Sequence, residues 1–130
     1  MTRFRLGQGA LGALQRSLVL PENIDEWRFA YIGWSIICGA TVGNRVPTLS
    51  CADKDGNFLW GIQATVAQTA GQAKIYTAGI ATERDGAAVS IFSSFGMQTG
   101  IKLLGGDVLS LGIGSGQADD RIGQSMWMFE

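Results

Sequence analysis

Histidine is absent from this 130-residue chain. The sequence therefore lacks the side chain that most often serves as a general base, activates a nucleophile or binds zinc. Metal-dependent enzymes of the cupin type are excluded on this ground. Carboxylates remain, but Glu22, Glu26 and Glu83 do not fall on the inward face of a regular strand pattern, where a catalytic acid is expected. We expect no enzyme activity, no catalytic residue, no cofactor and no bound metal.

Charge is also scarce. Charged residues make up 16% of the chain, against roughly 25% in an ordinary soluble domain. Protein interfaces are depleted in Lys, Glu and Asp, so the composition predicts that other protein chains cover much of the surface. A monomer with a neutral surface of Ser, Thr and Gln is the alternative. The net charge of -1 favours no nucleic acid, and no apolar run reaches the roughly 18 residues of a membrane span, so we expect neither partner.

Cysteine and proline occur only twice each, whereas glycine occurs 19 times. Cys38 and Cys51 lie in strand-like runs and are expected to be buried free thiols, with a disulfide between neighbouring strands as the alternative. Hydrophobic residues make up 46% of the chain, which is enough for one packed core. The frequent glycines favour a β-rich fold with many turns.

Apolar and polar residues alternate through most of the chain from residue 26 onward, which is typical of β-strands. The most regular segment, 58–66, places Phe58, Trp60, Ile62, Ala64 and Val66 on one face, with Trp60 and Ile62 in the expected core. Segment 26–42 also fits a helical stripe, but its β-branched and aromatic residues favour a long strand. Eight strands are expected, at residues 26–42, 45–52, 58–66, 73–82, 89–95, 101–104, 108–113 and 121–130.

Two acidic segments are predicted to be turns. Asp53–Asn57 has Asp-Gly at its centre, which is typical of a hairpin. The same segment resembles the start of a calcium loop, but Ala64 stands where the bidentate carboxylate is required. Asp119 and Asp120 are expected in a solvated loop before the last strand, with a cation-binding site as the alternative.

Residues 1–20 differ from the rest because glycines interrupt a basic, leucine-containing stretch. We predict an N-terminal arm over residues 1–20 that orders on a neighbouring subunit, followed by a β-sandwich domain over residues 21–130. A strand that begins at residues 17–20 is the alternative for the end of the arm. The expected fold class is all-β, an antiparallel sandwich of about eight strands with a jelly-roll-like arrangement. Four residues of the arm, and two tryptophans on strand faces with mixed neighbours, form the expected interface: Arg3, Arg5, Leu6, Leu11, Trp27 and Trp127.

The chain resembles small virion structural proteins of tailed bacteriophages. The resemblance is carried by Glu26-Trp27-Arg28-Phe29 in an early strand, the Asp-x-x-Gly hairpin at 53–56, and Leu-Leu-Gly-Gly-Asp-Val-Leu-Ser-Leu at 103–111. Asp-Asp-Arg-Ile at 119–122 then leads into a final strand. The pattern covers most of residues 20–130.

This resemblance implies a capsid decoration or minor structural protein that is located in the virion and assembled in the host cytoplasm. Its implied partners are other virion proteins and copies of itself, with a trimer as the expected homo-oligomer. A carbohydrate- or receptor-binding sandwich is the alternative function, and two or more exposed aromatic side chains on one concave face would favour it.

Overall fold

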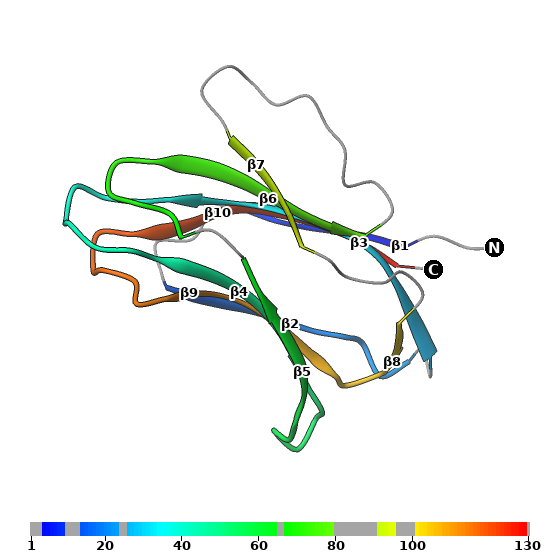
Figure 1. The fold of residues 1–130 in the computed structure, drawn as a ribbon. Coiled ribbons are helices and arrows are strands. Elements are labelled where there is room, and N and C mark those ends of the chain that lie inside the picture. The colour runs from blue at the N-terminus through cyan, green and yellow to red at the C-terminus, as the bar shows by residue number, and fades with distance from the viewer. Residues whose placement is uncertain are drawn as a thin grey trace.

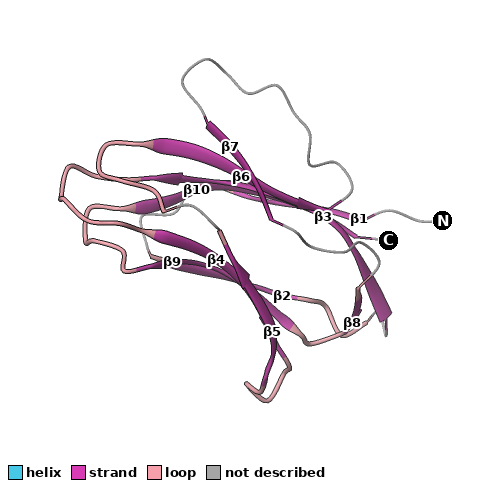
Figure 2. Cartoon of the chain, viewed as in Figure 1, coloured by secondary structure: helices cyan, strands magenta, loops and turns pink. Residues whose placement is uncertain are grey.

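The computed structural model describes residues 4–9, 14–23, 26–64, 67–79, 91–95 and 101–129. These residues form β-strands joined by turns and loops, and none of them is helical (Figures 1 and 2). The ten strands are β1 (Phe4–Gln8), β2 (Gln15–Val19), β3 (Glu26–Ile37), β4 (Val46–Ala52), β5 (Phe58–Gln63), β6 (Ala73–Gly79), β7 (Ile91–Phe95), β8 (Lys102–Leu104), β9 (Val108–Gly114) and β10 (Arg121–Phe129).

The strands form two sheets that face each other (Figure 1). The six-stranded sheet has the order β1-β10-β3-β6-β7, and β8 also pairs with β3. The four-stranded sheet has the order β2-β9-β4-β5. All described pairs are antiparallel except β6 with β7, which is parallel. The predicted all-β, antiparallel sandwich is therefore confirmed.

The order of pairing is that of a jelly roll. Earlier strands pair with later strands in reverse order: β4 with β5, β3 with β6, β2 with β9, and β1 with β10. The chain is thus one long hairpin rolled into two four-stranded sheets, to which β7 and β8 are added. Its innermost turn is the predicted Asp53–Asn57 hairpin, where Asp53 Oδ1 accepts the backbone N–H groups of Asp55 and Asn57.

The expected N-terminal arm needs correction, because residues 4–8 and 15–19 are strands in the chain's own two sheets. The backbone hydrogen bonds of β1 to β10 and of β2 to β9 offset the conformational entropy that this glycine-containing segment loses when it becomes ordered. Gly7 lies opposite Met126, and a Cβ on Gly7 would come 3.4 Å from the Met126 Cε. Gln8 is fixed further, because its Oε1 accepts hydrogen bonds from Ser125 Oγ at 2.9 Å and Trp127 Nε1 at 3.2 Å.

The hydrophobic core lies between the sheets and is rich in aromatic rings. Trp34 and Tyr76 stack with ring centroids 5.7 Å apart, and Trp27 meets the edge of Phe129 at 5.2 Å. β3 supplies the largest share of this core through alternating side chains, as the predicted long strand requires. The core is formed by Leu20, Trp27, Phe29, Ile32, Trp34, Ile36, Cys38, Leu49, Cys51, Ala64, Tyr76, Leu103, Leu109, Leu111, Ile113, Ile122, Trp127 and Phe129.

Strand β5 is less buried than its regular alternation predicts, because it forms an edge of the four-stranded sheet. Trp60 and Ile62 are only partly buried against the core. A bulge at Cys51/Ala52 pairs Ala52 with Phe58 and Cys51 with Trp60, so Phe58 leaves the inward face and is 72% exposed. The placement of Trp60 and Ile62 on the inward side is correct, and that of Phe58 is not.

Truncating Trp127 to alanine should therefore lower the free energy of unfolding by about 3–5 kcal/mol, because the side chain is fully buried among other rings. Trp60→Ala should lower it by less, since Trp60 lies at the sheet edge. Chemical denaturation of both variants measures the two losses. A larger loss for Trp60→Ala would contradict the described position of the core.

Candidate functional site

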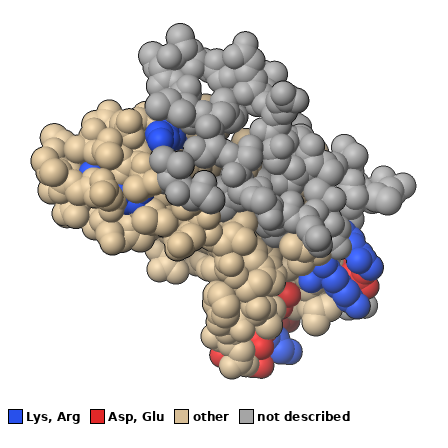
Figure 3. Space-filling model, in the orientation of Figure 1, with Lys and Arg blue, Asp and Glu red and all other residues tan. Residues whose placement is uncertain are grey.

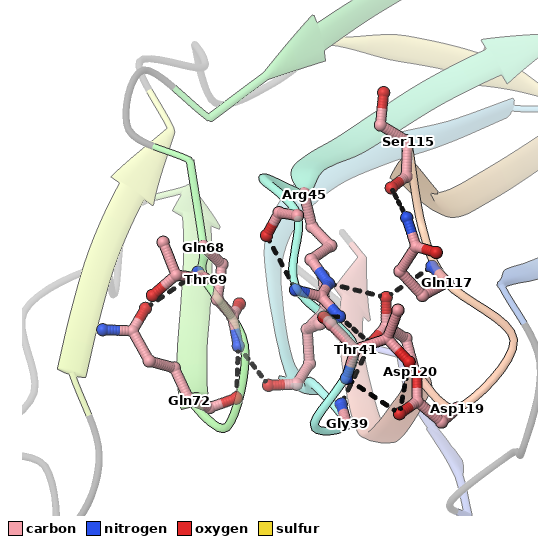
Figure 4. A network of polar contacts seen from close by, with 12 residues as sticks. Gly39, Thr41, Arg45, Gln68, Thr69, Gln72, Ser115, Gln117, Asp119 and Asp120 are labelled. Carbon is pink, nitrogen blue, oxygen red and sulfur yellow. Dashed lines mark hydrogen bonds and ion pairs between the residues drawn. The ribbon is translucent and has the colours of Figure 1, made fainter.

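One end of the sandwich holds a cluster of buried polar side chains contributed by several loops (Figure 4). Its centre is an ion pair between Arg45, just before β4, and Asp120, just before β10, and both side chains are completely buried. Arg45 Nε donates to Asp120 Oδ2 at 2.9 Å, and Arg45 Nη2 donates to Oδ1 at 3.0 Å. The two hydrogen bonds make the contact bidentate, which is the strongest geometry for this pair.

Backbone groups satisfy the remaining hydrogen-bonding capacity of the pair. Arg45 donates to the carbonyl oxygens of Gly43 at 2.7 Å and Thr41 at 2.6 Å. The Asp120 carboxylate accepts the N–H groups of Gly39 at 3.0 Å and Gln117 at 2.7 Å. A buried ion pair is tolerated only when its other donors and acceptors are satisfied, and here they fasten the β3–β4 loop to the β9–β10 loop.

The pair is ionised over the ordinary pH range. Hydrogen bonds from the Arg45 guanidinium lower the pKa of Asp120 to about 2, and the opposing effect of burial is smaller. Two backbone N–H donors act in the same direction as the guanidinium. The hydrogen bond with Asp120 in turn raises the pKa of Arg45.

A second buried side chain, Gln68, ties the segment before β6 to the same region. Its Nε2 donates to the carbonyl oxygens of Ile36 at 2.9 Å and Gln72 at 2.7 Å, and its Oε1 accepts the Tyr76 hydroxyl at 2.8 Å. Burial raises the pKa of Tyr76, so this hydroxyl stays protonated and able to donate. Gln68 and Arg45 also exchange two backbone hydrogen bonds of 2.8 Å.

This polar cluster, formed by Arg45, Gln68, Tyr76 and Asp120, holds the loops together. Asp120 and Arg45 satisfy each other's charge and hydrogen-bonding groups, so neither side chain is placed to act on a substrate. The structure also corrects one expectation: Asp120 is a buried ion-pair partner, not part of a solvated loop. Asp119 is exposed as expected, and it accepts two hydrogen bonds from Thr41.

The outward face of the four-stranded sheet bears no charged side chain among the residues that the structure describes. We call it the neutral face. The alternation of burial along the strands places its residues: Gln15, Ser17 and Val19 of β2; Val46, Thr48, Ser50 and Ala52 of β4; Gly61 and Gln63 of β5; and Val108, Ser110, Gly112 and Gly114 of β9.

Charges gather elsewhere on the described surface. Figure 3 shows red and blue atoms around the β4–β5 turn and around β8, with mainly tan atoms over the rest of the described surface on that side. Near β8, Glu26 pairs with Arg28 at 2.7 Å and with Lys102 at 3.5 Å. The lone charged residue of β2, Arg16, alternates with the neutral-face positions and donates to the Gly9 carbonyl oxygen.

The neutral face is hollowed on both sides of β4. One hollow of about 270 Å³ lies toward β5 and a second of about 330 Å³ lies toward β9. Phe58 projects beside the first. A Cβ on Gly61 would lie 3.1 Å from the Phe58 Cζ and 3.5 Å from the Ser50 Cβ, so the ring covers Gly61 on the face that carries Ser50.

A wider hollow of about 530 Å³ lies on the six-stranded sheet. Gly7, Gly33, Tyr31 and Met126 are among its lining residues, and none of the lining residues carries a charge. The hollow therefore lacks the acid–base pairs that hydrolytic or transfer chemistry uses.

The six residues expected at an interface are not brought together. Arg3 and Leu11 lie outside the described residues. Arg5 and Leu6 lie in β1, where their backbones pair with Met128 and Trp127, and their side chains are outside the description. Their proposed interface role is untested.

Trp27 and Trp127 are corrected, because the structure buries both in the chain's own core, with 2% and 0% exposure. A register irregularity between Ile122 and Ser125 shifts the alternation of β10, so Ile122 and Trp127 both face inward. Trp27 is buried between Phe129 and strand β8, whose Leu103 pairs with it.

The sequence did not reveal the roles of three residues that shape the site. Arg45 and Asp120 lie 75 positions apart, so no local pattern links them. Phe58 was predicted in the core because the alternation of apolar and polar residues in the sequence does not reveal the bulge beside it. The scarcity of charge was the one signal that pointed toward the neutral face.

Both cysteines are free and buried, as predicted. Burial raises the pKa of the Cys51 thiol to about 12 and also raises that of Cys38, so neither forms a thiolate near neutral pH.

Within the described residues, no three His, Cys, Asp or Glu side chains are grouped as a metal site would require. The same part of the chain contains no helix long and apolar enough to cross a membrane.

The topology and the site together define a jelly-roll β-sandwich with a neutral sheet face. No protein-family profile matches the chain, and no curated protein matches it. Among solved structures, a chain of the T13 viral particle of infectious bursal disease virus (IBDV) aligns with 98% of this chain at 9% identity and a TM-score of 0.45. A chain of the Gx strain of the same virus aligns with 99% at 11% identity and a TM-score of 0.47.

The chain spans about a third of the length of these two viral chains, 31% and 33%.

Asp120→Asn should lower the free energy of unfolding at neutral pH by about 3–5 kcal/mol, because it leaves a buried guanidinium without its counter-charge. The wild-type pair should also impose a pH dependence. Since folding lowers the Asp120 pKa from 3.8 to about 2, its stabilisation is present above pH 4 and is lost as the pH falls toward 2.

Thermal unfolding between pH 5 and 2 measures both effects. Asp120→Asn should flatten the acid limb, and Asp55→Asn in the exposed β4–β5 turn is the matched control. An equally steep acid limb in Asp120→Asn would contradict the assignment.

Alkylation should distinguish the buried thiols from a disulfide. The native protein should react slowly with iodoacetamide because burial blocks access and disfavours the thiolate. After denaturation without reductant, intact mass should show both cysteines modified, and an unmodified protein would contradict the free-thiol state.

Proposed function

We propose that this chain is a structural component of a virion that works through contacts with other protein chains. The single observation that carries the proposal is the neutral face, which spans all four strands of one sheet without a charged side chain. Interfaces are depleted in charged residues at their centre, whereas solvent-facing sheet surfaces ordinarily carry them.

The edges of the four-stranded sheet support the same proposal. β5 pairs only with β4 and β2 only with β9 among the described strands. Neither outermost strand contains the proline that commonly blocks edge pairing, and β5 has no charged residue at all. An edge of this kind is compatible with a chain whose surface is covered in an assembly.

The jelly roll narrows the functional class by analogy of fold, since it recurs in viral capsid proteins, lectin domains and cupins. A cupin-type metal centre depends on histidine ligands, and this sequence has none. The absence of histidine therefore leaves the capsid and lectin classes.

The alternative carbohydrate- or receptor-binding function depends on clustered exposed aromatic rings. Trp27, Trp34 and Trp127 are at most 2% exposed, and Trp60 is partly buried. Among the aromatic side chains that the structure describes, Phe58 alone is mostly exposed. A single exposed ring does not form the cluster of aromatic rings on which this alternative function depends, so the observations favour the structural role.

The finer proposal follows the resemblance to tailed-phage proteins: a capsid decoration, cement or minor virion protein, without enzyme activity, assembled in the host cytoplasm. It contacts other virion proteins and further copies of itself. The resemblance implies a trimer, whereas the geometry of the neutral face fits a dimer, and a mass measurement in solution distinguishes the two.

The test is incorporation into particles. Mass spectrometry of purified particles from the source should detect the chain in many copies, and its absence would contradict the proposed function. Ser50→Lys, at the centre of the neutral face, should reduce incorporation because it buries an unpaired charge. Asn23→Lys, in an exposed turn, is the matched control and should incorporate normally.

A further inference from the structure

We propose that the neutral face joins two copies of this chain, with Phe58 of each copy seated in the β4–β9 hollow of the other. The inference rests on the proposed structural role and names a partner for its surface. It also assigns a role to Phe58, the most exposed aromatic side chain among the described residues.

The lack of charge on the neutral face favours a second copy of the chain as the partner. A strongly charged partner, such as a nucleic acid or an acidic peptide, would lose hydration against the neutral face and gain no opposite charge. A second copy presents the same neutral surface, so both faces are covered without burying an unpaired charge. Serine and threonine hydroxyl groups on the face supply adaptable donors and acceptors, such as the Ser17–Ser110 pair at 3.0 Å.

Shape provides a projection and a recess on the same face. The Phe58 ring is 72% exposed and stands over Gly61, whereas the β4–β9 hollow of about 330 Å³ includes Thr48, Ser110 and Gly112 in its lining. Glycine keeps that hollow open: a Cβ on Gly112 would come 2.6 Å from the Thr48 Oγ1 and displace it.

Strand register shows that the two features meet under one symmetry operation. Ser50 pairs with Gly61 on one side and with Ser110 on the other, so the three residues form one row across β5, β4 and β9. A two-fold axis laid along β4 exchanges β5 with β9. It places the Phe58 ring, which stands over Gly61, against Ser110 of the second copy, and repeats the contact in reverse.

This arrangement is isologous and closes at two copies. An axis parallel to the strands also keeps the two sheets aligned, which is a common geometry for sheets packed face to face. The inner face of each sheet stays in its own sandwich core, so dimerisation needs no refolding.

The test uses the full-length protein and measures mass by sedimentation over a concentration series. The wild type should form a dimer. Phe58→Lys and Ser110→Glu should each weaken it, raising the dissociation constant roughly tenfold or more, as loss of a central aromatic contact does. Val42→Lys, at a loop position 88% exposed and outside the neutral face, is the control and should leave the dimer unchanged.

Mixing the two weakened variants gives the sharper result. In the mixed dimer the new ammonium and carboxylate groups face each other, and the other Phe58–Ser110 contact keeps its native residues. The mixture should therefore form a dimer more tightly than either variant alone. Circular dichroism confirms that each variant is folded, which is expected because Phe58 is mostly exposed and Ser110 lies on the outward face.

Three results would overturn the inference: a monomeric wild type, a trimer, or a dimer that Phe58→Lys does not weaken. None of them contradicts the proposed function, which particle incorporation tests separately. A monomer that still enters particles would show that the neutral face binds a different virion protein. A chain that dimerises but is absent from particles would retain the interface and lose the virion role.

Discussion

The fold depends on pairing the earlier strands of the chain with the later strands in reverse order. Only the β4–β5 pair is closed by a short local turn, and every further pair is wrapped around it. Each successive pair joins residues farther apart in sequence, so its loop-closure entropy increases while its hydrogen bonds stay similar in strength. The Asp53–Asn57 turn is therefore the local feature from which the long-range order of both sheets can grow, and topologies of this kind fold slowly.

The polar cluster fastens this rolled hairpin at one end. Arg45 precedes β4 and Asp120 precedes β10, so their ion pair connects an early part of the chain to a late one and also connects the two sheets. The neutral face lies on the outside of the sheet that Arg45 leads into. The small hydroxyl and glycine residues of this face make few side-chain contacts with one another. The polar cluster fixes the loops at the border of the face.

Strands whose alternation is unbroken could be predicted from the sequence, and β4, β9 and much of β3 lie where it placed them. The prediction was wrong where a bulge changes the facing of a strand, at Phe58 and at Trp127, because a bulge shifts alternation without changing composition. β1 and β2 were missed because Gly7 in β1, and Gly9 and Gly12 between the two strands, resemble a flexible segment until the partner strands are known. The Arg45–Asp120 pair could not be foreseen, since only the completed fold brings the two residues together.

The pairing of β1 with β10 places Phe4 directly opposite Phe129, at matched positions on neighbouring strands of one sheet. Two residues near opposite ends of the sequence thus lie one strand spacing apart, about 5 Å. A short peptide could join them, and new ends could be opened at Asp55–Gly56, where the turn is exposed. Such a circular permutant would keep every strand neighbour but would lack the short connection between β4 and β5. It would therefore change the order in which the sheets form without changing the final fold.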